Sequence, residues 1–325
     1  IKVFYGTGKI KKNGKDLKKV EVILNENNKN ISLFAPKIIL ATGASSKNLP
    51  FVSSDGNLIW DYKSALIPKT LPNSIVIIGS GAIGVEFASF YADLGVKVTI
   101  VELLENILPN EDHEISDFVF KNFKSRGINI MTNAKLINVE STTNVKCKVN
   151  LNGKEIEVES EKMILAVGVN ANINNLGLEE FDIKVSQNVI ETNEWMETSE
   201  KGIYAIGDLT KGPWLAHKAS HEAIICIEKI NGLNPHPIVT DEIPGCTYSR
   251  PQVASIGLTE KEAKKHGYSL KIGKFSFTGN GKAIALGDSD GFVKTIFNNK
   301  TGELIGAHLV GPEVTELVQG FAIAK

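Results

Sequence analysis

Cysteine is scarce in this sequence of 325 residues. Its three cysteines, Cys147, Cys226 and Cys246, are odd in number and far apart, which excludes a small disulfide-held secreted scaffold and favours a reducing compartment. Neither sign of charge is in excess, with 36 Lys and Arg against 37 Asp and Glu, so no long-range field attracts nucleic acid or an anionic membrane. No apolar run approaches the roughly 20 residues of a membrane-spanning helix. We therefore expect a globular protein with no nucleic acid and no membrane among its partners.

Both ends of the sequence look like interrupted elements. The chain starts at Ile1 rather than Met, and residues 1–6 are typical of a strand already under way, with residues 3–5 at its centre. Residues 315–325 form an amphipathic helical pattern that stops without a glycine or a cap. We expect the chain to be a piece of a longer protein.

The arrangement of apolar residues predicts an α/β protein with an α+β module after it. Residues 1–70 contain mainly short strands, and residues 74–131 alternate between strand and helix, with helices over 83–94 and 114–125. This alternation predicts a parallel sheet covered by helices. Antiparallel strands follow, with Asn152 and Gly153 suited to a type I′ hairpin turn. From about residue 243, several strands and one helix over 260–266 predict the mixed module.

A glycine-rich turn after the strand at 74–78 is the most informative motif. Gly79 permits a tight turn, Gly81 allows the backbone to approach a diphosphate, and Gly84 allows close packing of helix and strand. The start of the following helix offers unpaired N–H groups and a partial positive charge to such an anion. The alternative is a turn that binds nothing, which the context of strand, turn and helix makes the weaker interpretation.

An acidic residue at the end of the second strand completes this motif. Glu102 lies 18 residues after Gly84, where a carboxylate accepts hydrogen bonds from adenosine ribose hydroxyls. It would repel a 2′-phosphate, and residues 101–105 contain no arginine to bind one. NAD is therefore predicted in preference to NADP.

Motifs along the whole chain occur in an order that resembles the two-dinucleotide flavoprotein disulfide reductases. These motifs are Ala-Thr-Gly at 41–43, the glycine turn at 79–84, Leu-Ala-Val-Gly at 165–168 and Gly-Ile-Tyr-Ala-Ile-Gly-Asp at 202–208. The stretches at 215–219, 248–257 and 305–312 resemble the dihydrolipoamide dehydrogenases within that family.

The resemblance implies the fold and the domain boundaries. It implies a two-dinucleotide-binding flavoprotein fold, in which a Rossmann-like NAD domain is inserted in an FAD domain and an α+β dimerisation domain follows. The expected ranges are 1–70 for part of the FAD domain, 71–170 for the NAD domain, 171–242 for the return to the FAD domain, and 243–325 for a truncated dimerisation domain.

The resemblance also implies which residues bind the two cofactors. Those expected at FAD are Gly8, Thr42, Gly43, Ala44, Asp208, Trp214, Leu215, Ala216 and His217. Those expected at NAD are Gly79, Ser80, Gly81, Ala82, Ile83, Gly84, Val85, Glu86, Glu102, Leu136 and Gly168. Without the resemblance, Leu136 would be an ordinary core residue and Asp208 a residue of a strand-end turn.

The family's redox machinery is absent from this sequence. The family carries a Cys-x4-Cys helix near its N-terminus and a His-Glu pair near its C-terminus, and neither is found between residues 1 and 325. The three cysteines are predicted to fill small core spaces. The resemblance implies that Glu86 pairs with a lysine beside the flavin, which would make it a helper of the flavin. No residue of this sequence is assigned as catalytic. His217 and His221 have no third ligand nearby, so no metal site is predicted.

The resemblance therefore implies an NAD-dependent FAD oxidoreductase that oxidises dihydrolipoamide to lipoamide. Its implied partners are a second copy of itself, through the C-terminal domain, and the lipoyl domain of a 2-oxo-acid dehydrogenase complex. The implied location is the cytoplasm, with the mitochondrial matrix or a plastid as alternatives. A soluble transhydrogenase or mercuric reductase of the same fold is one alternative function, and a nucleotide-binding fragment without redox turnover is another.

Overall fold

The computed structural model describes residues 1–14 and 17–325, and contacts divide it into two compact units. Unit 1 contains residues 1–45 and 169–240, and unit 2 contains residues 46–168 and 241–325. Each unit has hydrophobic clusters of its own. Within the described residues, no helix is both long enough and apolar enough to cross a bilayer.

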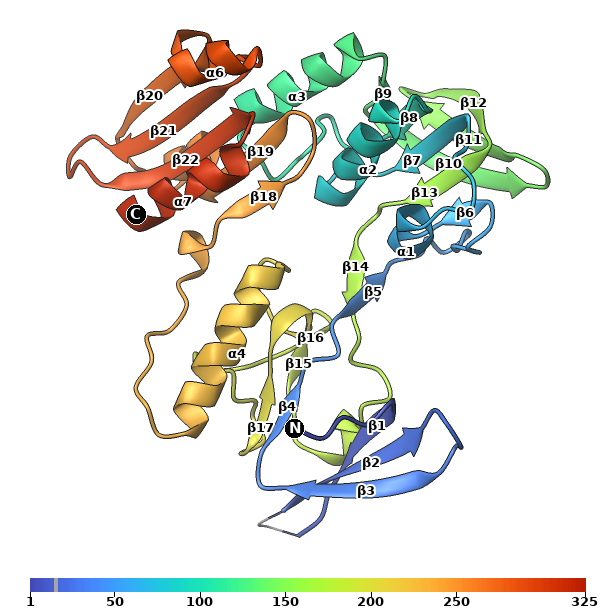
Figure 1. Cartoon of the computed structure of the whole chain (residues 1–325), viewed down its shortest axis with the longest axis vertical. Helices are drawn as coiled ribbons and strands as arrows, with labels where there is room; N and C mark the ends of the chain where they lie inside the picture. Colours follow the sequence, from blue (N-terminus) through green and yellow to red (C-terminus); the bar gives the residue numbers. More distant parts are fainter. Residues whose placement is uncertain (15–16) are drawn as a thin grey trace. The chain divides into compact units, whose positions relative to one another are not determined.

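A five-stranded parallel sheet forms the first half of unit 2 (Figure 1). Its strands, in spatial order, are β6 (Ile59–Trp60), β13 (Lys162–Leu165), β7 (Ser74–Ile78), β8 (Lys97–Val101) and β9 (Asn129–Met131). The helices of this part are α1 (Tyr62–Leu66), α2 (Ala82–Asp93) and α3 (His113–Ser125). The expected parallel sheet with covering helices is confirmed.

Alternation along β7 explains why this sheet is covered on both faces. Ile75 and Ile77 are buried in the cluster that includes the apolar residues of α2 and α3. Val76 and Ile78 are buried in a different cluster, with residues of an antiparallel meander. Because successive side chains of a strand point to opposite faces, an uninterrupted apolar run is what such a strand requires.

The meander consists of β10 (Ala134–Ser141), β11 (Val145–Leu151) and β12 (Lys154–Ser160). Asn152 and Gly153 connect the last two strands with φ values of +52° and +87°. Positive φ at both central residues is the requirement of a type I′ turn, so the predicted hairpin is confirmed.

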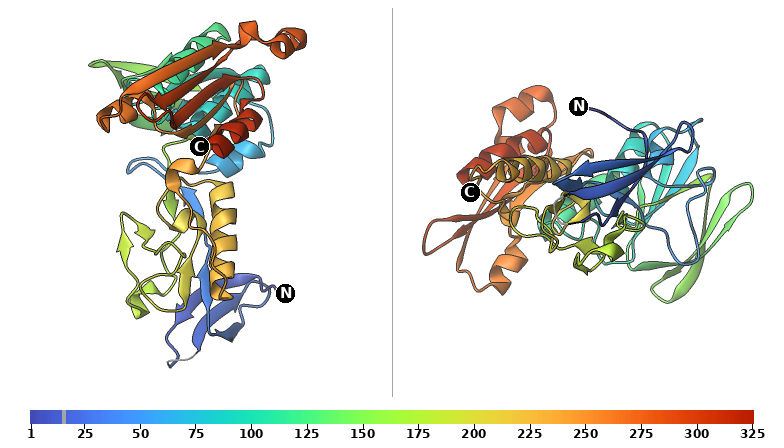
Figure 2. Two further views of the ribbon diagram at one scale, coloured as in Figure 1. Left: turned by 90° about the vertical axis from the view of Figure 1, so that its left-hand side faces the viewer. Right: turned by 90° about the horizontal axis from the view of Figure 1, so that it is seen from below.

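The second half of unit 2 is an antiparallel sheet with helices. Its strands, in spatial order, are β18 (Gly245–Thr247), β19 (Gln252–Gly257), β22 (Leu304–Gly311), β21 (Phe292–Asn298) and β20 (Leu270–Ser276). Its helices are α5 (Glu260–Lys265), α6 (Gly281–Leu286) and α7 (Val314–Ala324), with the 3-10 turn η4 (Phe277–Gly279). α7 packs against β19 and β22 (Figure 2). The predicted α+β module is confirmed.

Unit 1 combines an antiparallel sheet with a pair of parallel strands and one long helix. The sheet contains β1 (Gly6–Lys11), β2 (Lys18–Leu24) and β3 (Asn30–Ala35). The parallel pair is β4 (Ile38–Leu40) with β17 (Ile203–Ala205), and the helix is α4 (Ala216–Ile230). The remaining elements of unit 1 are β14 (Val169–Ala171), η1 (Leu178–Glu180), β15 (Val185–Ser186), β16 (Val189–Ile190) and η2 (Gly207–Leu209). β5 (Ala44–Ser46) and η3 (Thr240–Glu242) lie where the chain passes from unit 1 to unit 2.

The structure differs from the sequence prediction at the first strand. Residues 3–5 are not in a strand, because β1 begins at Gly6, opposite Leu24 at the end of β2. Beyond that pair the partner strand has ended, and the N–H of Asn25 donates to the carbonyl of Tyr5 at 2.9 Å.

The expected boundary near residue 70 also falls inside a structural unit. β6 and α1 precede residue 70, yet β6 joins the parallel sheet beside β13. β6 has two residues and α1 has five, so neither is long enough to show an apolar period in the sequence. The four domain ranges remain predictions.

Candidate functional site

The turn between β7 and α2 has the steric properties that its glycines predict. Gly79 has φ +99°, and a Cβ added there would lie 2.4 Å from the carbonyl oxygen of Ala166. A Cβ on Gly84 would lie 2.1 Å from the carbonyl oxygen of Gly79. Neither position can accept a side chain unless the backbone moves, because both distances are far below van der Waals contact.

Gly81 differs, because a Cβ there would meet nothing within 4 Å. Gly81 is the exposed N-cap of α2, and within the described part of the chain no side-chain hydrogen bond caps the helix. The first N–H groups of the helix therefore remain available at its positive end. Open space beside these donors fits the diphosphate of a dinucleotide.

Glu102 lies one strand away from this turn, directly after β8. The N–H of Gly79 donates to the carbonyl of Val101 at 2.9 Å, which joins the two strand ends. Oε2 of Glu102 accepts the N–H of Ser80 at 2.8 Å and its hydroxyl at 2.6 Å. The structure thus places a buried carboxylate beside the glycine turn, where the sequence predicts the ribose-binding acid.

The other residues expected at NAD differ in how accessible they are. Gly168 is exposed just after β13, whose neighbour in the sheet is β7. Ala82 is exposed at the start of α2, and Ile83 is partly buried. Val85 is fully buried, and Leu136 is 7% exposed within the cluster of the meander. Contact of each residue with NAD remains a prediction.

Glu86 links α2 to the C-terminal part of unit 2. Its Oε1 accepts the backbone N–H of Tyr248 at 2.8 Å. Burial raises the pKa of Glu86, and the hydrogen bond from Tyr248 opposes that shift. The structure gives this residue a contact that sequence reasoning did not predict.

In unit 1, parallel pairing brings two of the expected FAD motifs together. β4 and β17 run side by side, and the N–H of Ile206 donates to the carbonyl of Leu40 at 3.1 Å. The loop with Thr42 and Gly43, which leads to Ala44 at the start of β5, therefore begins at the same edge as the turn with Asp208. A Cβ on Gly43, with φ +66°, would meet nothing within 4 Å, so this edge has room for a ligand.

Asn172 fixes the loop that carries Thr42, and sequence reasoning missed it. Its backbone carbonyl accepts the hydroxyl of Thr42 at 2.8 Å, and its side-chain amide donates to the carbonyl of Thr42 at 3.0 Å. The Asn172 amide oxygen also accepts the hydroxyl of Ser45 at 2.8 Å. No local motif marks Asn172, because its partners lie about 130 residues earlier.

A buried ion pair supports the turn that carries Asp208. Lys218 and Glu222, four residues apart on α4, meet at 2.7 Å with side chains 4% and 5% exposed. The N–H of Gly207 donates to Oε2 of Glu222 at 2.6 Å, and Lys218 donates to the hydroxyl of Thr210 at 3.0 Å. The i, i+4 spacing is a signal that could have revealed this pair.

The remaining residues expected at FAD lie on two other elements. Trp214, whose indole N–H donates to the carbonyl of Thr210 at 3.0 Å, precedes α4. Leu215 is the N-cap of α4, and Ala216 and His217 are exposed in its first turn. Gly8 lies in β1 opposite Val22. Their contacts with FAD remain predictions.

The cysteines are placed as the sequence predicts. All three are free, with Cys147 and Cys226 buried and Cys246 partly buried. Burial raises the pKa of the Cys147 thiol to about 12 and that of Cys226 to about 11. Both therefore remain protonated thiols at neutral pH, which makes them poor nucleophiles.

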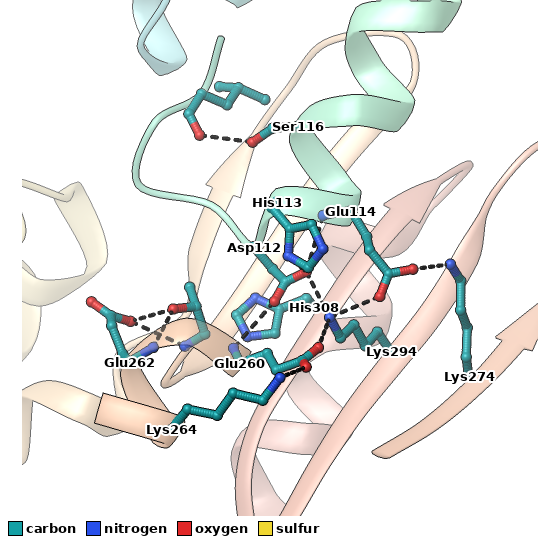
Figure 3. Close-up of polar contacts among 12 residues, drawn as sticks. Asp112, His113, Glu114, Ser116, Glu260, Glu262, Lys264, Lys274, Lys294 and His308 are labelled. Atoms are coloured by element: carbon teal, nitrogen blue, oxygen red, sulfur yellow. Dashed lines mark hydrogen bonds and ion pairs between the residues drawn. The ribbon is translucent and has the colours of Figure 1, made fainter. Parts of the chain in front are cut away.

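A second polar cluster joins α3 to the C-terminal sheet within unit 2 (Figure 3). Lys294 of β21 has a fully buried side chain, and its Nζ lies 2.9 Å from Asp112, 2.9 Å from Glu114 and 2.7 Å from Glu260. Burial favours a neutral lysine, but the hydrogen bonds with these carboxylates outweigh burial and raise its pKa. For Asp112 also, burial raises the pKa, but Lys294 outweighs it and the net shift is downward.

Comparisons with known proteins agree with this arrangement. Residues 1–223 match the family described as "Pyridine nucleotide-disulphide oxidoreductase", and residues 243–325 match its dimerisation domain. The chain is 51% identical over 296 residues to a dihydrolipoyl dehydrogenase of Rhizobium etli, covering 89% of this chain and 61% of that protein. It is 42% identical over 299 residues to one of Bacillus subtilis, covering 91% of this chain and 63% of that protein.

Solved structures show the same fold. The crystal structure of LpdA from Mycobacterium tuberculosis has a TM-score of 0.90 at 27% identity, covering 98% of this chain and 70% of that one. The HOCl-induced flavoprotein disulfide reductase RclA from Escherichia coli has a TM-score of 0.83 at 25% identity, covering 94% of this chain and 69% of that one. The chain spans 61% and 63% of the length of the two dihydrolipoyl dehydrogenases named above.

Proposed function

This chain belongs to the pyridine nucleotide-disulphide oxidoreductase family, and from that membership we propose that it forms the central and C-terminal part of a dihydrolipoyl dehydrogenase. The intact enzyme would catalyse dihydrolipoamide + NAD⁺ → lipoamide + NADH + H⁺. The observation that carries the proposal is the pairing of the glycine turn after β7 with the buried carboxylate of Glu102 after β8. The identity to dihydrolipoyl dehydrogenases over about nine-tenths of the chain supports the choice of substrate.

The NAD end of the reaction would use residues of unit 2. The N-terminus of α2, with Gly81 and Ala82 exposed, would hold the diphosphate. Glu102 would accept a hydrogen bond from the adenosine ribose and repel a 2′-phosphate. Both contacts would bind and position the nucleotide. Neither would take part in the reaction of the nicotinamide, which would occur with the flavin.

The FAD end would use residues of unit 1. The loop with Thr42 and Gly43 and the turn with Asp208 share one strand edge, and Asp208 is partly exposed there. FAD, when bound, would carry electrons between a dithiol and NAD⁺. The role of Asp208 would be to accept hydrogen bonds from the ribityl hydroxyls, and that of the buried Lys218–Glu222 pair would be to hold its turn.

The intact enzyme would act as a homodimer in the cytoplasm, with the mitochondrial matrix or a plastid as alternative locations. The match of residues 243–325 to a dimerisation domain supports the dimer. The lipoyl domain of a 2-oxo-acid dehydrogenase complex would supply the dithiol. A soluble transhydrogenase or a mercuric reductase is the alternative within the fold, and a redox-inactive fragment is the alternative outside it.

The test measures NADH formation at 340 nm from dihydrolipoamide and NAD⁺ by the intact, flavin-loaded protein. We expect turnover with dihydrolipoamide and NAD⁺, and none with Hg²⁺ and NADPH or between NADPH and NAD⁺. Ala82→Asp places a carboxylate where the diphosphate would bind, so we expect a rise of about tenfold or more in KM for NAD⁺. Lys261→Asp, in the first turn of α5, is the control and should leave KM unchanged. A flavin-loaded protein that does not oxidise dihydrolipoamide would contradict the proposal.

A further inference from the structure

The carboxylate of Glu102 is held by hydrogen bonds from two residues. Oε2 accepts both the backbone N–H of Ser80, at 2.8 Å, and its hydroxyl, at 2.6 Å. Oε1 accepts the backbone N–H of Leu104 at 2.8 Å. The hydroxyl contact is the shortest of the three and has the length of a charge-assisted O–H···O⁻ bond.

The backbone of Glu102 is fixed as firmly as its side chain. Its N–H donates to the carbonyl of Met131 at 2.8 Å, and its carbonyl accepts the N–H of Ala134 at 2.8 Å. The position of the Cα is therefore set by the neighbouring strand β9 and the start of β10. What the hydroxyl of Ser80 adds is control over the orientation of the carboxylate itself.

Ser80 is fully buried, whereas Glu102 remains 7% exposed. The hydroxyl of Ser80 thus donates its hydrogen bond to Glu102, and its burial keeps it out of contact with a bound nucleotide. A carboxylate has about four acceptor positions, and the three donors leave one of them, on Oε1. A ribose hydroxyl can use that position without displacing a bond already present.

We propose that Ser80 is a positioning residue, which orients the Glu102 carboxylate for one hydroxyl of the adenosine ribose and thereby sets the preference for NADH over NADPH. The inference rests on the proposed function, because it takes NAD as the ligand. It changes the role predicted for Ser80 from direct contact with NAD to action through Glu102. Preorganisation of this kind lowers the cost of ordering an acceptor when the ligand binds.

The test compares Ser80→Ala with the wild type in the intact protein, by fluorescence titration with NADH and with NADPH. Without the hydroxyl, the carboxylate can turn away, so we expect the Kd for NADH to rise about fivefold while the Kd for NADPH changes less than twofold. In turnover, KM for NAD⁺ should rise by the same factor with kcat unchanged. Ser89→Ala removes another buried serine hydroxyl, which accepts the N–H of Arg250, and should leave both Kd values unchanged.

A double-mutant cycle separates positioning from a general structural effect. In a Glu102→Ala background, Ser80→Ala should change the Kd for NADH less than twofold, because the group through which it acts is gone. Glu102→Met, which keeps the side-chain length and removes both acceptor oxygens, is the second background if Glu102→Ala does not fold. An unchanged Kd in Ser80→Ala, or a fivefold loss that persists without Glu102, would overturn the inference alone. Failure of the wild-type protein to bind NADH would overturn the proposed function as well.

Discussion

Gly81 and Gly84 belong to the same glycine-rich motif, at the N-cap and in the first turn of α2, yet have opposite surroundings. A Cβ on Gly84 would lie 2.1 Å from the carbonyl oxygen of Gly79, whereas a Cβ on Gly81 would meet no protein atom within 4 Å. Gly84 is therefore required by the fold, and Gly81 by the ligand that the turn would bind. The two positions separate a structural requirement from a functional one.

We predict that Gly84→Ala destabilises the protein by about 1 to 3 kcal/mol, the usual cost of overpacking, and also abolishes tight NADH binding. Gly81→Ala should cost less than about 1 kcal/mol, the N-cap preference for glycine over alanine, because Gly81 has φ −65° and open space around it. Its methyl group would occupy the approach to the diphosphate, so the Kd for NADH should rise about tenfold. Thermal unfolding and NADH titration of both variants are the measurements. A Gly81→Ala protein with wild-type affinity would show that the diphosphate binds elsewhere.

At the scale of elements, a buried lysine connects α3 with β21. Asp112, the N-cap of α3, and Glu114 in its first turn both face Lys294, and Glu260 of α5 completes the set (Figure 3). The ring of Phe118 on α3 also meets Phe292 of β21, with centroids 5.7 Å apart. Ionic and apolar contacts thus join the helix of the parallel sheet to the C-terminal sheet.

Replacing Lys294 with methionine should destabilise the protein by about 3 to 5 kcal/mol, because three carboxylates would lose their common buried cation. Lys274→Met is the matched control, since this half-exposed lysine contacts only Glu114 of the three carboxylates. We expect it to cost no more than about 1 kcal/mol. Urea unfolding at pH 7 measures the free energy of unfolding of both variants. Equal losses of stability would show that the buried position of Lys294 adds nothing to its stabilising effect.

His308 makes the stability of the contact between α3 and the C-terminal sheet depend on pH. It pairs with Lys294 across the strands, and its Nε2 lies 3.0 Å from the carbonyl of Leu258. Its Nδ1 is buried and has no hydrogen-bond partner among the residues that the structure describes. Burial lowers its pKa, the Leu258 carbonyl and the charges of Asp112 and Glu262 oppose that shift, and Lys294 adds to it. The folded protein therefore holds this ring neutral at a pH where the unfolded chain protonates it.

We predict that stability decreases as the pH falls below about 6.5, where the histidine of the unfolded chain gains its proton first. His308→Gln should flatten this decrease between pH 7 and pH 5. The carboxylates around Lys294 have lowered pKa values, so their contribution is lost only at more acidic pH. Unfolding temperatures across this range are the measurement, with the exposed His266→Gln as control. Parallel curves for wild type and His308→Gln would contradict the assignment.

At the scale of the whole molecule, the C-terminal domain carries exposed apolar side chains. Leu317 and Ile323 of α7 are 48% and 80% exposed, and Ile284 and Leu286 of α6 are 59% and 58% exposed. Because residues 243–325 match a dimerisation domain, we expect a second copy of the protein to cover this surface.

Leu317→Asp should shift the intact protein from dimer to monomer in size-exclusion chromatography with light scattering, because a carboxylate would be buried at the interface. Leu71→Asp, a similarly exposed position 52% accessible and outside the C-terminal domain, should leave the dimer intact. A monomeric wild type, or dissociation of both variants, would contradict this prediction.

Elements with a strong local pattern could be predicted from the sequence. The helix predicted over 83–94 is α2 at Ala82–Asp93, and the helix predicted over 114–125 is α3 at His113–Ser125. Their apolar spacing and glycine stops are local signals. The strand at residues 3–5 was predicted wrongly, since a strand needs a partner and local propensity does not show where that partner ends.

The sequence alone determined the glycine turn, its following helix and the acid one strand later, because each follows from short-range sterics and spacing. Only the tertiary structure decided which groups hold that acid, which residues fix the Thr42 loop, and what surrounds Lys294. Ser80 and Glu102 are in contact although they are 22 residues apart in the sequence, and Asp112 and Lys294 are in contact although they are 182 residues apart. Such contacts depend on how strands pair and helices pack, which no local pattern encodes.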